Sequence, residues 1–387
     1  MDSTHRRQGP FCIWHGMQLG TWLRLLRLKP PIAPSRWASV LGITAASCSN
    51  SALALAERLF YGRKLRQTDV PQPVFIIGHW RSGTTLLHNL LSLDQQFVTP
   101  SLYQTVFPAH FLVSQRFLAP MTARFLPPKR PMDEIPVTGW DMPQEDEIAI
   151  CLLSLVSPYL MLAFPDHRAA YEKFLDLRQV SDDVRERWKE TFLGLLKKVV
   201  LHQEGRRPLL KSPTHSYRIP LLLELFPDAK FVHIVRNPYR VIMSSLHLRR
   251  ITFSDNAFYS PSFANIEDDV FALYERCFER LEEDLPLLGP NQLHELRLED
   301  LECDIPGELA RMYSALNLPG YSALEQAVSS RLPTLRSFKK NAFHLSDDLQ
   351  KQIERRCRRV FDRYGYALRE SGPFVHGVSP EKVVATE

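Results

Sequence analysis

Residues 74–94, which read VFIIGHWRSGTTLLHNLLSLD, restrict the fold of this chain more than any other stretch. The apolar run at 74–77 is typical of a strand buried on both faces in a parallel sheet. Gly78 ends this strand, and a leucine-rich pattern beginning at Thr84 predicts a helix. A strand, a loop of small residues and a helix in this order bring backbone N–H groups and a helix N-terminus to one place. The stretch therefore predicts an anion site, and phosphate is the usual ligand of such sites.

The loop has the spacing of a Walker A motif but lacks its lysine. Gly78 and Gly83 are spaced as in G-x-x-x-x-G-K-[ST], and Thr84 stands at the lysine position. The loop therefore lacks the cation that reaches the β- and γ-phosphates of a nucleoside triphosphate. The loop cation is instead Arg81. A P-loop NTPase or kinase remains an alternative, which this difference and the absence of an obvious Walker B strand ending in Asp disfavour.

Arg-Ser-Gly-Thr-Thr at residues 81–85 resembles the 5′-phosphosulfate loop of sulfotransferases that use 3′-phosphoadenylyl sulfate (PAPS). The resemblance implies that Arg81 acts at the leaving group. It also implies that the backbone amides of Ser82, Gly83, Thr84 and Thr85 bind the 5′-phosphate.

A second motif follows another predicted buried strand, KFVHIV at residues 230–235. Arg236-Asn237-Pro238, with Ser244 eight residues after the arginine, resembles the 3′-phosphate motif of the same family. Pro238 favours a turn into a helix, so Ser244 would lie about two turns along that helix. Arg236 and Ser244 can then converge on one phosphate, the arginine with its fork of donors.

A third predicted strand ends in polar residues, in the segment PLLKSPTH at 208–215. Parallel sheets bind ligands at the carboxyl ends of their strands. The segment resembles the Leu-Lys-x-Pro sequence of the broader family, which implies that Lys211 contacts the phosphosulfate of PAPS. A solvated lysine at a strand end is the structural alternative.

The general base that takes the acceptor proton is less clearly marked. Related enzymes often place a glutamate soon after the first helix, where this chain has Gln104, which cannot accept that proton. Bacterial enzymes of this type often carry Pro-x-Glu-[Asp/Glu], which occurs here at residues 143–146. Glu145 is therefore our first candidate for the base and His215 the second. Both have structural alternatives, an acidic helix start for Glu145 and a hydrogen-bonded helix-start histidine for His215.

The net charge of +5 is unevenly distributed. Residues 1–70 carry ten basic and three acidic residues, a balance of +7, so the remainder sums to −2. The basic residues are Arg6, Arg7, Arg24, Arg27, Lys29, Arg36, Arg58, Arg63, Lys64 and Arg66. The acidic residues are Asp2, Glu57 and Asp69. No nucleic-acid-binding signature accompanies them, so we expect no nucleic-acid partner. A membrane surface or an anionic acceptor suits the segment better.

Residues 38–56 carry no charge, which leaves three interpretations open. The segment is a helix packed on the catalytic domain, an interfacial helix, or a membrane span. Its interruption by Ser39, Thr44, Ser47, Ser49 and Asn50 disfavours a span, which needs about 20 predominantly apolar residues. We expect peripheral membrane contact through residues 1–66.

The six cysteines are scattered and form no C-x-x-C pair, which argues against a metal site and a dense disulfide framework. No signal peptide is apparent, so we expect a cytoplasmic protein, peripheral at the membrane.

The resemblance covers roughly residues 71–366. It implies an α/β, P-loop-like three-layer fold, in which helices flank a central parallel sheet of four or five strands, and no metal requirement. We divide the chain into a basic, partly apolar helical segment at 1–70, a sulfotransferase domain at 71–370 and a loose tail at 371–387. We expect the Pro- and aromatic-rich residues 97–140 to be irregular rather than sheet. A basic loop with Arg336, Lys339 and Lys340 is a further candidate for the 3′-phosphate site.

The implied reaction moves a sulfuryl group from PAPS to an acceptor hydroxyl or amine and releases adenosine 3′,5′-bisphosphate. The sequence does not name the acceptor, which is a carbohydrate, a lipid or another small molecule. A non-catalytic, membrane-associated scaffold is the alternative from another class of protein.

Overall fold

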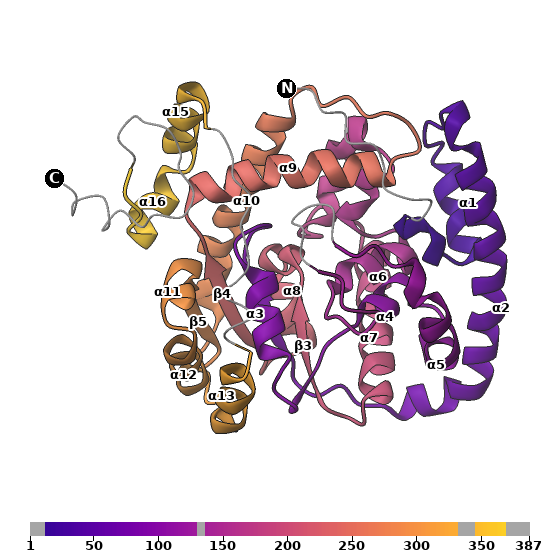
Figure 1. Cartoon of the computed structure of the whole chain (residues 1–387), viewed down its shortest axis with the longest axis horizontal. Helices are drawn as coiled ribbons and strands as arrows, with labels where there is room; N and C mark the ends of the chain where they lie inside the picture. Colours follow the sequence, from indigo (N-terminus) through magenta and orange to yellow (C-terminus); the bar gives the residue numbers. More distant parts are fainter. Residues whose placement is uncertain (1–11, 130–135, 332–344, 369–387) are drawn as a thin grey trace.

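A five-stranded parallel sheet lies at the centre of the protein, whose computed structural model describes residues 12–129, 136–331 and 345–368. The strand order is β2-β3-β1-β4-β5. The strands are β1 (Val74–Ile77), β2 (Phe97–Val98), β3 (Arg207–Lys211), β4 (Lys230–Val235) and β5 (Leu293–Arg297). Figure 1 shows helices on both sides of this sheet. The predicted α/β, P-loop-like architecture is confirmed.

β1 is the central strand, and its apolar run explains why. Val74 and Ile76 pack into the core on one face of the sheet, and Phe75 and Ile77 pack into the core on the other. A strand with two apolar faces needs helices on both sides. β1 pairs in parallel with β3 on one edge and β4 on the other. The loop that leaves β1 therefore lies between the ends of β3 and β4, where Lys211 and Arg236 are found.

Helices α3 (Thr84–Leu91), α11 (Leu298–Cys303), α12 (Ile305–Ala315) and α13 (Tyr321–Ser329) contribute to the core that contains Val74. The core that contains Phe75 receives α7 (Asp182–His202), α8 (Ile219–Leu225), α9 (Pro238–Asn256) and α10 (Ile266–Asp284). Short 3-10 helices connect several elements. They are η1 (Ile13–Gly16), η2 (Pro34–Arg36), η3 (Ala123–Phe125), η4 (Pro158–Leu162), η5 (Pro165–Phe174), η6 (Pro213–Tyr217) and η7 (Leu285–Leu287).

The prediction of an irregular segment at residues 97–140 is wrong for much of its length. It contains β2, α4 (Leu102–Val106) and α5 (Phe111–Thr122). Ser101 caps α4 by accepting a hydrogen bond from the Gln104 amide, and Pro120 stands in the last turn of α5. The prolines of this segment are therefore compatible with short helices.

Near the end of the described chain lie two short helices, α15 (Asp347–Arg356) and α16 (Arg358–Tyr364). They are separated at Cys357, and Gly365 ends α16 in a left-handed conformation. The basic loop with Arg336, Lys339 and Lys340 and the predicted tail from residue 371 lie outside the described residues.

The N-terminal helices α1 (Leu19–Arg27) and α2 (Trp37–Gln67) pack on the rest of the protein through a third core. In it, Trp14, Trp22 and Ile43 meet Cys151 and Leu152 of α6 (Asp146–Ser154). The packed helix among the three interpretations of residues 38–56 therefore describes one side of α2. By length and composition, α2 with its preceding turn is also apolar enough to cross a membrane.

Candidate active site

The loop between β1 and α3 depends on two glycines. Gly78 and Gly83 adopt φ angles of 149° and 101°, in the region that favours glycine. A Cβ on Gly78 would lie 2.5 Å from the Ile234 carbonyl oxygen, and one on Gly83 would lie 2.6 Å from Leu298 Cδ1. The loop can therefore pack this closely against β4 and α11 only with glycine at both positions.

The loop offers several groups suited to phosphate. Gly83 is the N-cap of α3, so the first amides of that helix have no partner within the helix. Among the described residues, the buried hydroxyl of Ser82 has no hydrogen-bond partner. Thr84 is buried and Thr85 half-buried at the start of α3. An orphaned hydroxyl, a helix N-terminus and Arg81 together fit a phosphate group.

The two predicted phosphate motifs meet. Arg81 Nε donates a hydrogen bond to Ser244 Oγ over 2.7 Å, and Arg236 Nη1 donates one to the Arg81 carbonyl over 3.1 Å. Asn237 caps α9 through its side chain and Pro238 is the first residue of that helix, as the motif predicts. Burial lowers the pKa of Arg236, against the raising effect of Glu302 and Glu299.

Lys211 and Glu145 form a second cluster beside the loop. Lys211 Nζ donates to Glu145 Oε1 over 2.8 Å, and the Tyr159 hydroxyl donates to Glu145 Oε2 over 2.5 Å. Trp80 Nε1, from the loop, donates to the Tyr159 hydroxyl over 3.3 Å. Burial, aided by the Glu145 charge, raises the pKa of Tyr159 well above 10, so Tyr159 stays a hydrogen-bond donor. The Glu145 side chain keeps 18% of its surface exposed, whereas Lys211 keeps 2%.

His215 belongs to a deeper layer than Glu145. Its side chain is fully buried, its Nε2 lies 3.0 Å from Asp146 Oδ2, and its ring packs on Phe75 and Phe192. Burial alone would raise the pKa of Asp146, but the charge and hydrogen bond of His215 lower it. The next acid, Glu147, forms a fully buried ion pair with Arg218, at 2.6 Å.

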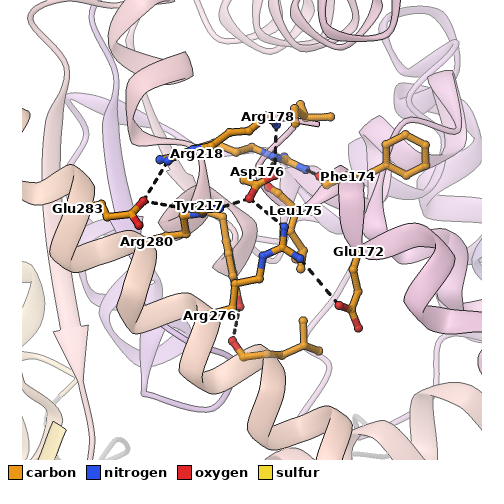
Figure 2. A network of polar contacts seen from close by, with 12 residues as sticks. Glu172, Phe174, Leu175, Asp176, Arg178, Tyr217, Arg218, Arg276, Arg280 and Glu283 are labelled. Atoms are coloured by element: carbon orange, nitrogen blue, oxygen red, sulfur yellow. Dashed lines mark hydrogen bonds and ion pairs between the residues drawn. The ribbon is translucent and has the colours of Figure 1, made fainter. Parts of the chain in front are cut away.

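Each of the three consecutive acids 145–147 therefore has a basic partner in the segment 211–218. Arg218 extends this arrangement, because it also donates to the carbonyl oxygens of Phe174 and Leu175. Figure 2 shows Arg276 and Arg280 of α10 converging on Asp176 next to these carbonyls, at 2.9 and 3.1 Å. The start of α6 is thus fixed to η6, and η6 to the turn that follows η5.

Three residues of the site escaped the sequence reasoning. Ser216 Oγ accepts a hydrogen bond from the Gly78 amide and thereby joins η6 to the loop. Trp80 and Tyr159 connect the loop to Glu145. Trp80 could have been found from its place inside the motif, whereas no pattern marks Tyr159. Gln104, at the family's glutamate position, is fully buried and accepts a hydrogen bond from the Ser101 amide.

This fold and site define a P-loop-like α/β protein with groups suited to phosphate at the carboxyl edge of its sheet. Residues 73–323 match the model of the sulfotransferase family. The chain is 36% identical, over 356 residues, to omega-hydroxy-beta-dihydromenaquinone-9 sulfotransferase Stf3 of Mycobacterium bovis and of Mycobacterium tuberculosis. The alignment covers 92% of this chain and 91% of those relatives. The protein belongs to the sulfotransferase family and is a transferase.

Two crystal structures share the fold. Sulfotransferase STF9 from Mycobacterium avium has a TM-score of 0.68 and 19% identity, with 90% of this chain and 92% of that chain covered. Sulfotransferase STF1 from Mycobacterium tuberculosis has a TM-score of 0.56 and 18% identity, with 87% and 90% covered. The NTPase or kinase alternative is therefore not favoured. A sulfotransferase requires a sulfuryl donor and an acceptor.

Proposed function

We propose that the protein transfers a sulfuryl group from PAPS to a hydroxyl group of a lipid acceptor and releases adenosine 3′,5′-bisphosphate. The convergence of Arg81, Arg236 and Ser244 carries the proposal, since it gives the donor two adjacent phosphate sites. The 5′-phosphosulfate would bind the Ser82–Thr85 amides, and the 3′-phosphate would bind Arg236 and Ser244. A nucleotide without a 3′-phosphate would leave the second site unused.

The proposed step is an in-line displacement at sulfur. The acceptor oxygen forms a bond to sulfur while the bond from sulfur to the 5′-phosphate oxygen breaks, and the acceptor proton passes to a base. Negative charge grows on the leaving phosphate, where Arg81 and Lys211 would stabilise it. Catalysis would therefore come mainly from positioning and electrostatic stabilisation.

Glu145 is the base in this proposal, and His215 has a structural role. Two observations support the choice. Glu145 is the partly exposed member of the acid run and lies within hydrogen-bond reach of Lys211, whereas His215 is fully buried against Asp146. A base must reach the proton that it removes. The carboxylate and the leaving-group cation then belong to one cluster.

The proposed acceptor class follows from the 36% identical relatives, whose name specifies a hydroxylated menaquinone derivative. We extend to this chain only the chemical class, a lipid that carries a free hydroxyl group. A carbohydrate or a polar small molecule is the competing acceptor. We also propose that the protein is cytoplasmic and lies at the membrane surface. All six cysteines lie in the described residues and none of them forms a disulfide there, which suits a reducing compartment.

The direct experiment supplies ³⁵S-labelled PAPS to the purified full-length protein with separate lipid and aqueous fractions of its host cell. We expect label in an organic-phase product that carries a sulfate ester, with stoichiometric release of adenosine 3′,5′-bisphosphate. Label in an aqueous product only would refute the lipid acceptor. Magnesium-dependent turnover of ATP or GTP without transfer from PAPS would refute the donor.

A further inference from the structure

Helix α2 buries polar side chains and exposes large apolar ones, which is unusual for a helix on a water-soluble surface. Its buried positions include Ser47, Asn50 and Glu57, with Val40 and Ile43 near its start. Its exposed large side chains are instead apolar: Trp37, Leu41, Leu55, Leu59 and Phe60. Leu59 and Phe60 each have 74% of their surface exposed. A helix that faces water usually has the opposite arrangement.

Specific polar contacts hold α2 in this orientation. Asn50 Nδ2 donates to the carbonyl oxygens of His15 and Met17, and Asn50 Oδ1 lies 3.1 Å from His110 Nε2. About two turns further along, Glu57 forms an ion pair of 2.5 Å with Lys198 of α7. These buried contacts lie along the middle of the helix, so the orientation does not depend on one end.

The outward side of α2 carries a mostly apolar stripe, with the exposed Ser49 at its edge. At helical spacing, the exposed residues are Ala38, Leu41, Ala45, Cys48, Ala52, Leu55 and Leu59. Their span of 21 residues corresponds to about 32 Å of helix. Exposed apolar areas of this extent mark interaction surfaces.

A second segment, distant in sequence, extends the stripe. α5 packs against α2, and the backbone amide of Leu112 at its start donates to Glu57. α5 and η3 expose Phe117, Met121 and Phe125, with 65%, 65% and 55% of their surfaces free. We define the apolar face as the exposed apolar side chains of α2, α5 and η3. Figure 1 shows α2 running along one whole side of the molecule, beside α1 and α5.

The charges that the helices of this part of the protein expose are all positive. α1, α2, α5 and η3 expose basic side chains, and their single acidic residue, Glu57, is buried. The exposed cations are Arg24, Arg27, Arg58, Arg63, Lys64, Arg66, Arg116 and Arg124. An apolar surface with a basic border complements a membrane that contains anionic lipids.

We propose that the apolar face docks on the surface of an anionic lipid bilayer, with α2 lying in the interface rather than crossing it. Extraction of α2 into the bilayer would separate Glu57 from Lys198 and leave both charges unpaired, which is expensive. Docking also explains why two neighbouring segments outside the sheet both expose large apolar side chains. The α6 helix, whose N-cap is Glu145, packs against the same N-terminal segment.

The idea that docking delivers the acceptor rests on the proposed function, whereas docking itself does not. A hydroxylated lipid would reach Glu145 from the bilayer on which the enzyme sits. The two ideas are therefore tested by separate measurements, vesicle binding without PAPS and sulfuryl transfer with it.

The test compares full-length protein with the triple variant Leu41→Gln, Leu55→Gln, Leu59→Gln in sedimentation with phosphatidylcholine vesicles, with and without phosphatidylglycerol. We expect the wild type to prefer the anionic vesicles and the triple variant to bind at least about tenfold less, with unchanged circular dichroism. The reversal Arg58→Glu, Arg63→Glu, Lys64→Glu should abolish the preference for anionic vesicles. The control is the double variant Leu287→Gln, Leu368→Gln, which changes exposed leucines outside the apolar face. It should bind vesicles as the wild type does.

Three results would overturn the proposal. The triple variant binds vesicles as well as the wild type does. Alkaline carbonate fails to release the protein from membranes, which indicates a span. The wild type is a dimer that the triple variant cannot form, and neither binds vesicles, which makes the face a subunit interface. Transfer to a detergent-solubilised lipid acceptor should be equal in wild type and triple variant. Failure of transfer in both would refute the proposed function and leave vesicle binding intact.

Discussion

Arg81 Nε lies 2.7 Å from Ser244 Oγ, although 163 positions separate the two residues in the sequence. The bond joins the loop after β1 to the second turn of α9. Arg236 strengthens the connection through the Arg81 carbonyl oxygen. The groups assigned to the 5′- and 3′-phosphates are therefore one structural unit, and a nucleotide with both phosphates would contact all of it.

Replacement of Arg236 by alanine should impair the proposed 3′-phosphate site and leave the 5′-phosphate site intact. We expect binding of PAPS and adenosine 3′,5′-bisphosphate to weaken by about 2–4 kcal/mol, because the partly buried cation proposed to bind the 3′-phosphate is lost. AMP, which has no 3′-phosphate, should bind with nearly unchanged weak affinity. Calorimetry measures all three. Arg250→Ala, an exposed arginine on the same helix, is the matched control. Equal losses for AMP and PAPS would contradict the assignment of Arg236.

The buried pair of Glu147 and Arg218 should contribute strongly to stability. Both side chains are fully buried, and Arg218 donates to both carboxylate oxygens. Glu147→Gln removes the charge and leaves a buried guanidinium, so the free energy of unfolding should fall by about 3–5 kcal/mol. Urea denaturation gives this value. Asp362→Asn, which breaks the exposed pair with Arg358, should change it by only about 0–1 kcal/mol. A small loss in both variants would show that the buried network is dispensable.

Local sequence patterns were sufficient to predict the part of the site in which the functional residues directly follow a strand. The apolar run at 74–77 and the glycines after it predicted β1, the loop and α3. The rule that parallel strands bind ligands at their carboxyl ends then brought Lys211 and Arg236 to the same edge. The register of β1 with β3 and β4 places them on opposite sides of the loop.

Contacts between distant segments could not be read from such patterns. The acids 145–147 are adjacent in sequence and resemble an ordinary helix start, yet their partners lie about 70 residues away in the 211–218 segment. Tyr159 has no motif, because its role depends only on its distance to Glu145. The orientation of α2 was equally hidden, since a helix rich in alanine and leucine does not reveal which side its few polar residues face.

Acid should weaken the fold around the loop. Burial lowers the pKa of His79 and of His88 to about 3, so both are neutral in the folded protein at neutral pH. An unfolded histidine has a pKa of about 6.5. Between these values the unfolded chain binds more protons, so stability is complete above about pH 6.5 and falls as the pH decreases. Each histidine should lower the free energy of unfolding by about 2 kcal/mol between pH 6.5 and pH 5.

Urea denaturation at pH 6.5 and pH 5 measures this loss. His110, whose pKa burial lowers to about 4, adds to it in the same direction. His79→Gln should reduce the pH dependence by about one histidine's share. An equal free energy of unfolding at both pH values would show that these side chains do not stay neutral when buried.

Glu145→Gln tests the proposed base. Glutamine keeps the shape of the side chain and an oxygen that can accept from Lys211 or Tyr159, but it cannot take the acceptor proton. We expect kcat to fall by about 10²–10⁴-fold while the affinity for PAPS changes little. Initial rates at saturating acceptor, with PAPS affinity from calorimetry, separate the two effects.

The choice of control variants depends on the contacts of the neighbouring acids. Glu147 looks like a harmless neighbour in the sequence, but its buried pair with Arg218 makes Glu147→Gln a stability variant. Glu190→Gln, an exposed carboxylate on α7, is the appropriate control and should retain full activity. His215→Asn should mainly lower stability, because it breaks the buried contact with Asp146. If Glu145→Gln remains active while His215→Asn abolishes turnover at unchanged stability and PAPS affinity, His215 is the base and Glu145 only positions Lys211.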